Sequence, residues 1–211
     1  MYGTARLRYP TQPGDMWEIG PHRLLCKDLC RLQGLPFPQV DVVYSDPPWE
    51  PAGYRRFAHY AGREPEMPFA EFYSHLVDLL RLACPTGLLM IWMSRSRWPD
   101  TAATFLAGGA CQLGTVPVEW GILWVGTFGR PEDWRIQFPA ERVDMLAWGG
   151  RFARGRRALD PCCGVGTQLR GLLAGGAAEV YGVEMLGDKL ANGVSSLARF
   201  TRQPAVRRRF E

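Results

Sequence analysis

The sequence has few of the residues from which metal sites are built. It contains three histidines and six cysteines. The histidines show no HExxH or paired spacing, and the only CxxxC pair, Cys26 and Cys30, has no second pair to complete a zinc pattern. We therefore expect no bound metal, and we expect the cysteines to be reduced, buried thiols.

Long apolar runs are also missing. No segment offers the roughly 18 uninterrupted apolar residues of a membrane-spanning helix. Residues 1–10 have no apolar centre of the kind found in signal peptides. Together with the expected free thiols, these absences predict a cytoplasmic protein that does not enter a membrane.

Charge of one sign is nearly balanced by the other, and lysine is scarce. The sequence has 25 Lys and Arg residues and 21 Asp and Glu residues, which gives a formal charge of +4. Apart from Lys27 and Lys189, every basic side chain counted there is arginine. Arginine suits bidentate contacts with phosphate and stacking on rings, so a nucleic-acid partner is compatible with this composition.

The 211 residues are 46% hydrophobic, which fits one α/β domain over residues 1–211. Apolar runs predict strands at 22–27, 40–44, 88–93, 122–126 and 179–183, with another before Asp160. Helical patterns fall at 29–34, 69–83, 99–107, 168–173 and 188–200. This alternation predicts a doubly wound, mostly parallel sheet.

The remaining segments read as irregular. We expect an N-terminal surface arm at 1–21, long loops at 50–68 and 128–140, and a solvated basic tail at 201–211. Residues 141–148 suit either a helix or an edge strand, and we favour a strand at 145–148.

One loop organises the chain, because it follows the buried strand 40–44 directly. It consists of Asp46-Pro47-Pro48-Trp49. Two successive prolines fix the backbone and remove two amide donors, so the strand ends in a rigid, open loop. Open α/β sheets bind their ligands at such strand ends. A Pro-rich turn with a core tryptophan is the alternative if this loop is considered alone.

A second loop follows the strand that ends at Asp160. Its sequence is Asp160-Pro161-Cys162-Cys163-Gly164-Val165-Gly166-Thr167. Gly164 and Gly166 begin a G-x-G-x-x-G pattern, but Leu169 replaces the third glycine and leaves the dinucleotide fingerprint incomplete. Glu184 lies eighteen residues beyond Gly166 at a strand end, where its carboxylate can hold two ribose hydroxyls.

With both loops in view, nearly the whole chain resembles the amino-methyltransferases. In that family a D-P-P-[YWF] loop holds the target amine, and a D-P-F-C-G-S-G-T-like loop holds S-adenosylmethionine. This sequence departs from the second pattern at Cys162 and Val165. The target loop precedes the cofactor loop, as in the circularly permuted, beta-type branch, so the resemblance implies a Rossmann-like methyltransferase sheet with permuted motif order.

The resemblance assigns residues to two sites. It implies a catalytic loop of Asp46, Pro47, Pro48 and Trp49, and a cofactor site made by Asp28, Asp160, Cys162, Gly164, Gly166, Thr167 and Glu184. In the family an acid at the Asp28 position contacts the adenine of the cofactor. For Asp28 a helix cap before Leu29 is an equal alternative.

Arginines near the target loop are candidates for nucleic-acid contacts. Segment 50–68 interleaves basic and aromatic residues, as a single strand requires for its phosphates and displaced bases. Ser94 to Trp98 follows another strand on the same edge. The candidates are Arg55, Arg56, Arg63, Arg95 and Arg97. A solvated loop is the alternative.

The resemblance implies methyl transfer from S-adenosylmethionine to the N6 amine of adenine in DNA. Asp before the two prolines resembles the adenine-directed members. RNA adenine, cytosine N4 in DNA, and a catalytically silent nucleic-acid-binding subunit are the alternatives. Because no large recognition domain is present, we expect sequence specificity that is short, loose or supplied by a separate partner. A homodimer is the other expected assembly.

Overall fold

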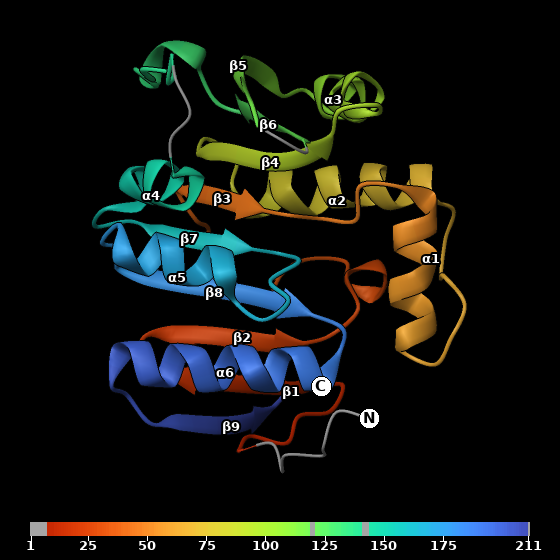
Figure 1. The fold of residues 1–211 in the computed structure, drawn as a ribbon, viewed down its shortest axis with the longest axis vertical. Helices are drawn as coiled ribbons and strands as arrows, with labels where there is room; N and C mark the ends of the chain where they lie inside the picture. Colours follow the sequence, from red (N-terminus) through yellow and green to blue (C-terminus); the bar gives the residue numbers. More distant parts are fainter. Residues whose placement is uncertain (1–7, 119–120, 141–143, 211) are drawn as a thin grey trace.

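The computed structural model describes residues 8–118, 121–140 and 144–210. In this part of the chain the strands form one nine-stranded sheet in the order β5-β6-β4-β3-β7-β8-β2-β1-β9 (Figure 1). Its five central strands are parallel: β4 (Leu88–Ser94), β3 (Val42–Ser45), β7 (Arg157–Asp160), β8 (Glu179–Glu184) and β2 (His22–Cys26). Antiparallel pairs extend both sides, namely β6 (Gly121–Thr127) with β5 (Cys111–Pro117), and β1 (Asp15–Ile19) with β9 (Ala205–Arg209).

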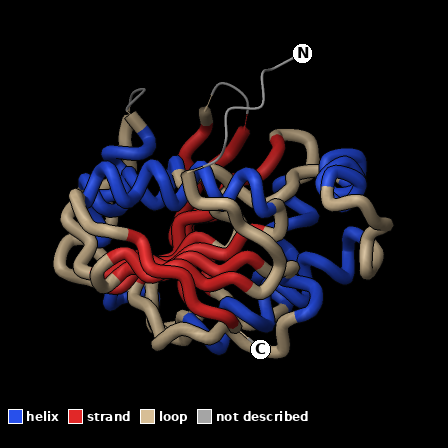
Figure 2. The backbone as a smooth tube through the Cα atoms, turned by 90° about the horizontal axis from the view of Figure 1, so that it is seen from below, coloured by secondary structure: helices blue, strands red, loops and turns tan. Residues whose placement is uncertain are grey.

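Helices cover both faces of the sheet, which confirms the doubly wound α/β class. Figure 2 shows the strands as a layer between helices. One face packs against α2 (Phe69–Ala83) and α3 (Trp98–Ala107), and the other against α4 (Met145–Gly150), α5 (Thr167–Ala174) and α6 (Gly187–Thr201). Short 3-10 helices lie at Leu29–Arg31, Pro131–Asp133 and Arg151–Ala153.

The central strands are buried on both faces, which explains their continuous apolar runs. All seven residues of β4 are buried, and so are all four of β3. The helix α2 instead buries one stripe, formed by Phe72, Tyr73, Leu76, Val77, Leu79 and Leu80. Its bounds are those that the sequence pattern predicts, because the stripe has a clear helical period.

The order in which strands are added to the sheet reverses between β3 and β7. From β3 the chain passes through α1 (Pro51–Tyr60) and α2 to β4 on one side, whereas from β7 it passes through α5 to β8 on the other. Since α2 and α5 lie on opposite faces, the connections that leave the carboxyl ends of β3 and β7 diverge. A crevice lies between these connections. Such switch points are where open α/β sheets bind ligands.

The prediction of an irregular segment at 50–68 is wrong for its first half, which is the helix α1. Pro51 fits the first helical turn, where a backbone N–H has no helical partner. Tyr54 and Ala58, four residues apart, are buried, while Arg55 and Arg56 face outward. Because α1 buries only these two residues, the polar residues between them hide the helical period in the sequence.

The favoured strand at 145–148 is also wrong, because residues 145–150 form α4. Asp144 caps this helix: its Oδ1 accepts from the N–H groups of Leu146 (2.9 Å) and Ala147 (3.3 Å). A side-chain acceptor at the N-cap decides between helix and strand where the apolar pattern does not. The first residues of the predicted segment, 141–143, lie outside the described residues.

Both predicted chain ends contain a strand instead of a free arm or tail. Within the predicted arm, β1 carries the buried Trp17, whose Nε1 donates to Thr11 Oγ1 at 3.0 Å. The predicted tail contains β9, whose three arginines pair with two acids of β1: Arg207 and Arg209 with Asp15, and Arg208 with Glu18. Residues 1–7 and 211 lie outside the described part.

The strand β5 has no counterpart among the predicted elements. It is an edge strand with mostly exposed or half-buried residues and a register shift between Gln112 and Gly114. Such a strand lacks the apolar run of a central strand. Among the described residues, none of the helices is both long enough and apolar enough to span a bilayer.

Candidate active site

A cavity of about 1120 Å³ opens at the carboxyl ends of β3, β7, β8 and β2. Both predicted loops line it, the first through Asp46, Pro48 and Trp49, and the second through 161–165 and Thr167. Asp28 and Glu184 line it as well. The cavity volume exceeds that of a typical single-ligand pocket, so two ligands can meet in it.

The target loop is held by its own residues and by α2. Trp49 Nε1 donates to Asp46 Oδ1 at 2.6 Å, and Tyr73 Oη donates to the Pro48 carbonyl at 2.9 Å. The Trp49 ring also packs against the backbone at Gly121, where an added Cβ would come within 3.1 Å of Cη2. The carboxylate and the indole therefore have fixed positions relative to each other.

The Asp46 carboxylate faces the cavity, so solvent reaches it although protein surrounds it on most sides. Burial among these walls raises the pKa of Asp46, and the hydrogen bond from Trp49 lowers it by a smaller amount. An acceptor with a raised pKa binds protons more strongly than an ordinary carboxylate. It is suited to hold the hydrogens of a bound amine.

The second loop turns tightly beneath the cavity. Gly164 (φ 51°) and Gly166 (φ 81°) both have left-handed backbone conformations, which favour glycine. The N–H of Gly166 donates to the Cys163 carbonyl at 2.7 Å, and the N–H of Cys163 donates to the Val183 carbonyl at 2.9 Å. These bonds fasten the loop to β8 and bring Cys162 and Thr167 to the cavity wall.

Glu184 ends β8 opposite that loop. Its Oε2 accepts from the Gly164 N–H at 3.0 Å, and its Oε1 accepts from the Leu186 N–H at 2.8 Å. Burial raises the pKa of Glu184, while these backbone donors and Lys189 lower it. A carboxylate has about four lone-pair sites, so both oxygens can accept further bonds from a ligand.

Asp160 lies behind the loop and is fully buried. Its Oδ1 accepts from Ser45 Oγ at 2.8 Å and from the Cys162 N–H at 3.1 Å. Its Oδ2 has no hydrogen-bond partner within residues 8–118, 121–140 and 144–210. Burial is the main reason that the pKa of Asp160 rises to about 7; the hydrogen bonds from Ser45 and the Cys162 N–H oppose this rise, and the charges of Asp46 and Glu184 add to it.

This raised pKa predicts how stability depends on pH. Between about pH 4 and 7 the unfolded chain has lost the Asp160 proton while the folded protein retains it, so unfolding releases a proton. The free energy of unfolding should therefore fall as pH rises through this window. In Asp160→Asn that fall should be smaller, because the buried amide does not titrate.

Denaturant titrations of both proteins at pH 4.5, 6 and 7.5 measure this difference. Asp78→Asn is the matched control, because Asp78 is an exposed acid that pairs with Arg81 on α2. The control should follow the wild-type curve. Parallel curves for wild type and Asp160→Asn would contradict a titration of Asp160 in this window.

Asp28 meets the cavity and also caps the 3-10 helix Leu29–Arg31, so the cap alternative is present in the structure. Its Oδ1 accepts from the Cys30 N–H at 3.0 Å, and its Oδ2 pairs with Arg63. The sequence predicts that Arg63 contacts nucleic acid; in the structure its side chain is 23% exposed and turned toward Asp28. It lies inward because Asp28 and Glu66 neutralise it.

The other predicted arginines lie near the target loop. Arg55 and Arg97 line one shallow groove of about 560 Å³ together with Ser96 and Glu50. Arg56 is exposed on α1, and Arg95 donates through Nη2 to the Val118 carbonyl. Of the five, Arg55 and Arg97 are the pair that the structure brings together.

Several cavity residues have no signal in the predicted motifs. They are Lys27, Tyr54, Phe57, Phe72, Trp92, Val116, Asp144, Met145, Met185 and Lys189. The scarcity of lysine is the one usable signal, since both lysines of the chain line this cavity. The predicted loop 128–140 also reaches the wall, through Pro139 and Ala140.

The described residues contain no group of three or more His, Cys, Asp or Glu side chains suited to a metal ion. The chemistry available at the cavity is that of carboxylates, aromatic rings and backbone groups. Four carboxylates line it, those of Asp28, Asp46, Asp144 and Glu184, against two lysine ammonium groups. This balance favours a ligand with positive charge.

No protein-family model and no curated protein matches the sequence. The fold is similar to the crystal structure of M1.HpyAVI, with a TM-score of 0.54 and 14% identity over 76% of this chain and 88% of that one. It is also similar to the PvuII DNA methyltransferase (cytosine-N4-specific), with a TM-score of 0.56 and 10% identity over 88% of this chain and 89% of that one. The chain therefore has an α/β fold of the kind found in DNA methyltransferases.

Proposed function

We propose that this protein transfers a methyl group from S-adenosylmethionine to the exocyclic N6 amine of adenine in DNA. The observation that carries the proposal is the meeting of two loops. The target loop 46–49 and the loop 160–167 leave neighbouring parallel strands, β3 and β7, and line one cavity. A donor held by one loop would face an acceptor held by the other.

The cofactor half of the cavity fits a positively charged nucleoside. When bound, S-adenosylmethionine supplies an activated methyl group on a sulfonium. The four lining carboxylates favour its sulfonium and ammonium charges, and aromatic rings such as Trp92 can face the cation. Glu184, at the strand end, would accept from the two ribose hydroxyls, and the 162–167 backbone would cradle the rest.

The acceptor half fits an aromatic amine. Such an amine is a weak nucleophile because its lone pair is delocalised into the ring. Donation of its two hydrogens to the Asp46 carboxylate and the Pro47 carbonyl would favour a tetrahedral nitrogen whose lone pair points at the methyl group. Trp49, fixed by its bond to Asp46, would stack on a base that has left the duplex.

The order of the strands supports a circularly permuted arrangement. On the side away from β7, β8 pairs with β2, which precedes the target loop in the sequence; in the described part of the chain α6 and β9 follow β8. The nucleotide-binding strands β7 and β8 therefore come late in the sequence, after the target loop. Asp before the two prolines is the feature that favours adenine over cytosine as the target.

The test is incubation with labelled S-adenosylmethionine and separate DNA and RNA substrates, followed by nucleoside analysis. We expect label in N6-methyladenine from DNA. Label in N4-methylcytosine would move the target to cytosine, and label only in RNA would change the substrate. No transfer from a protein that binds the cofactor would favour a silent nucleic-acid-binding subunit or the need for a specificity partner.

Arg55 and Arg97 should bind DNA phosphates beside the target loop. Each phosphate contact contributes about 0.9 to the slope of log affinity against log salt. The double substitution Arg55→Ala, Arg97→Ala should flatten that slope by up to about two units and weaken binding to all sequences similarly, because phosphate contacts do not read bases. Binding curves at several salt concentrations measure it.

The matched control replaces two exposed arginines away from the cavity, at the end of the molecule where the central strands begin. They are Arg81 and Arg199, in the last turns of α2 and α6. It removes the same charge and should leave the slope within about half a unit of the wild-type value. If the two double variants behave alike, net charge and not the groove sets the slope.

A further inference from the structure

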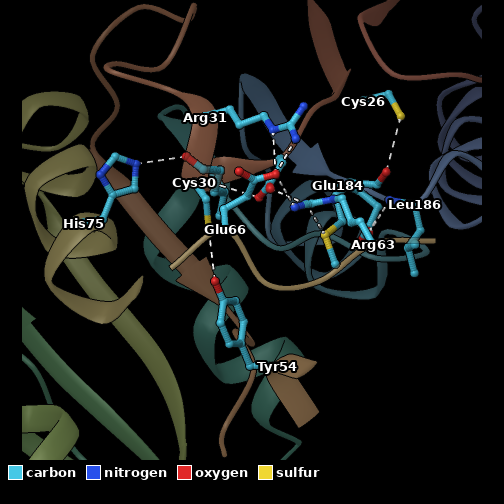
Figure 3. Close-up of polar contacts among 12 residues, drawn as sticks. Cys26, Cys30, Arg31, Tyr54, Arg63, Glu66, His75, Glu184 and Leu186 are labelled. Atoms are coloured by element: carbon cyan, nitrogen blue, oxygen red, sulfur yellow. Dashed lines mark hydrogen bonds and ion pairs between the residues drawn. The ribbon is translucent and has the colours of Figure 1, made fainter. Parts of the chain in front are cut away.

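The Arg63 side chain, from the segment after α1, contacts residues at the β2 end of the cavity (Figure 3). Its Nη2 pairs with Asp28 Oδ2 and lies 3.5 Å from Met185 Sδ, and its Nη1 donates to Glu66 Oε1 at 2.9 Å. Asp28 and Met185 line the cavity. The guanidinium therefore contacts two residues of the cavity wall at the end formed by β2 and β8, although Arg63 itself does not line the cavity.

Each oxygen of the Asp28 carboxylate already has one partner. Its Oδ1 accepts from the Cys30 N–H, which fixes its orientation. Its side chain is 12% exposed and that of Arg63 is 23% exposed. A ligand donor that approaches Asp28 Oδ2 therefore competes with the guanidinium for that oxygen.

Glu66 gives the guanidinium a second partner outside the cavity. Arg31 also donates to the same Glu66 oxygen, through Nε at 3.0 Å. When Arg63 leaves Asp28, it can keep its bond to Glu66, so opening costs one ion pair and not two. A rearrangement of this one side chain would therefore free Asp28 Oδ2.

The helix α1 crosses the same end of the cavity and carries further contacts. Lys189 Nζ lies 4.4 Å from the centroid of the Phe57 ring, and Tyr54 Oη lies 3.4 Å from Cys30 Sγ. Both aromatic residues line the cavity. Since α1 begins at Pro51, two residues after Trp49, these contacts connect the target loop to the β2 end of the cavity.

We propose that Arg63 is a latch on the nucleoside end of the cofactor site, held closed by Asp28 and displaced when the cofactor binds. The proposal rests on the proposed function, which supplies S-adenosylmethionine as the ligand. A ligand that must first open a latch has its apparent affinity reduced by the fraction of open protein. Arg63 thus controls cofactor entry and does not contact DNA.

Arg63→Ala should bind S-adenosylmethionine about tenfold more tightly than wild type, which corresponds to a latch closed about nine-tenths of the time. The gain should lie mainly in the association rate. Adenosine, which reaches only the nucleoside end, should show the same gain. Calorimetric titration and stopped-flow fluorescence of the cavity tryptophans measure affinity and rate.

Arg31→Ala is the matched control, because Arg31 shares Glu66 but does not touch the cavity. Its affinity should stay within about twofold of wild type, since the Asp28 pair persists. Arg63→Gln keeps a polar side chain and removes the charge, so it should reproduce the gain if Arg63→Ala is too unstable to titrate.

The outcomes separate this proposal from the proposed function. Equal or weaker binding by both Arg63 variants, with a wild type that binds the cofactor, overturns the latch and leaves the function intact. If wild type and variants all fail to bind either ligand, the proposed function is wrong and the latch loses its ligand. Tighter and faster binding by the Arg63 variants alone supports the latch.

Discussion

Asp46→Ala should lower the rate of methyl transfer by at least about a hundredfold, as is typical for loss of a group that handles a proton in the reaction. Asp46 is the only carboxylate of the target loop, and Trp49 holds one of its oxygens at 2.6 Å. Without it, the amine has no anionic acceptor for its hydrogen and its lone pair is no longer directed. Single-turnover transfer to DNA measures the loss.

Cofactor affinity should change little in the same variant, because the loop 160–167 and Glu184 line another part of the cavity. The control is Asp188→Ala, which removes an exposed acid from the first turn of α6, outside the cavity lining. It should transfer at the wild-type rate. Turnover by Asp46→Ala within about tenfold of wild type, or roughly 1.4 kcal/mol of barrier, would refute this role for Asp46.

Trp49→Phe tests the companion part of the loop. Phenylalanine keeps a ring for stacking but cannot donate to Asp46. Because that hydrogen bond lowers the pKa of Asp46 against the effect of burial, its loss should raise the pKa further. The acid limb of the pH–rate profile should then shift to higher pH in this variant.

The central sheet could be predicted from the sequence because burial on both faces leaves an uninterrupted apolar run. This holds for β3, β4 and β8, and the single-sided stripe of α2 is equally clear. The outer elements carry no such signal. In β9 three consecutive arginines look like a solvated tail, but the segment pairs with β1, and its arginines pair with Asp15 and Glu18, about 190 residues away.

The site divides in the same way. The convergence of loop residues such as Asp46, Gly164 and Glu184 on one cavity was predictable, because short motifs at strand ends have a strong sequence pattern and the parallel sheet brings strand ends to one edge. Which arginines face outward was not predictable. Arg55 and Arg63 look alike in the sequence, yet Arg63 turns inward because two acids from different parts of the chain, Asp28 and Glu66, pair with it.

Glu184→Ala should weaken the binding of S-adenosylmethionine by about 1.5 to 3 kcal/mol, the cost of losing hydrogen bonds to a charged acceptor. This corresponds to roughly a ten- to hundredfold higher Kd. The carboxylate ends β8 beside Gly164 and is well placed to accept from the ribose. Calorimetric titration with S-adenosylmethionine and with S-adenosylhomocysteine reads the change without requiring turnover.

Glu184 also accepts from the N–H groups of Gly164 and Leu186, so its removal disturbs the loop as well as the ligand contact. Glu184→Gln separates the two effects, because its one carbonyl oxygen can keep a backbone bond but no negative charge. Glu179→Gln, at the other end of β8, is the matched control and should bind the cofactor as wild type does. We expect Glu184→Gln to lie between the control and Glu184→Ala in affinity. If all three variants bind equally well, the ribose is held elsewhere, and the loop 160–167 loses the partner on which its assignment to S-adenosylmethionine depends.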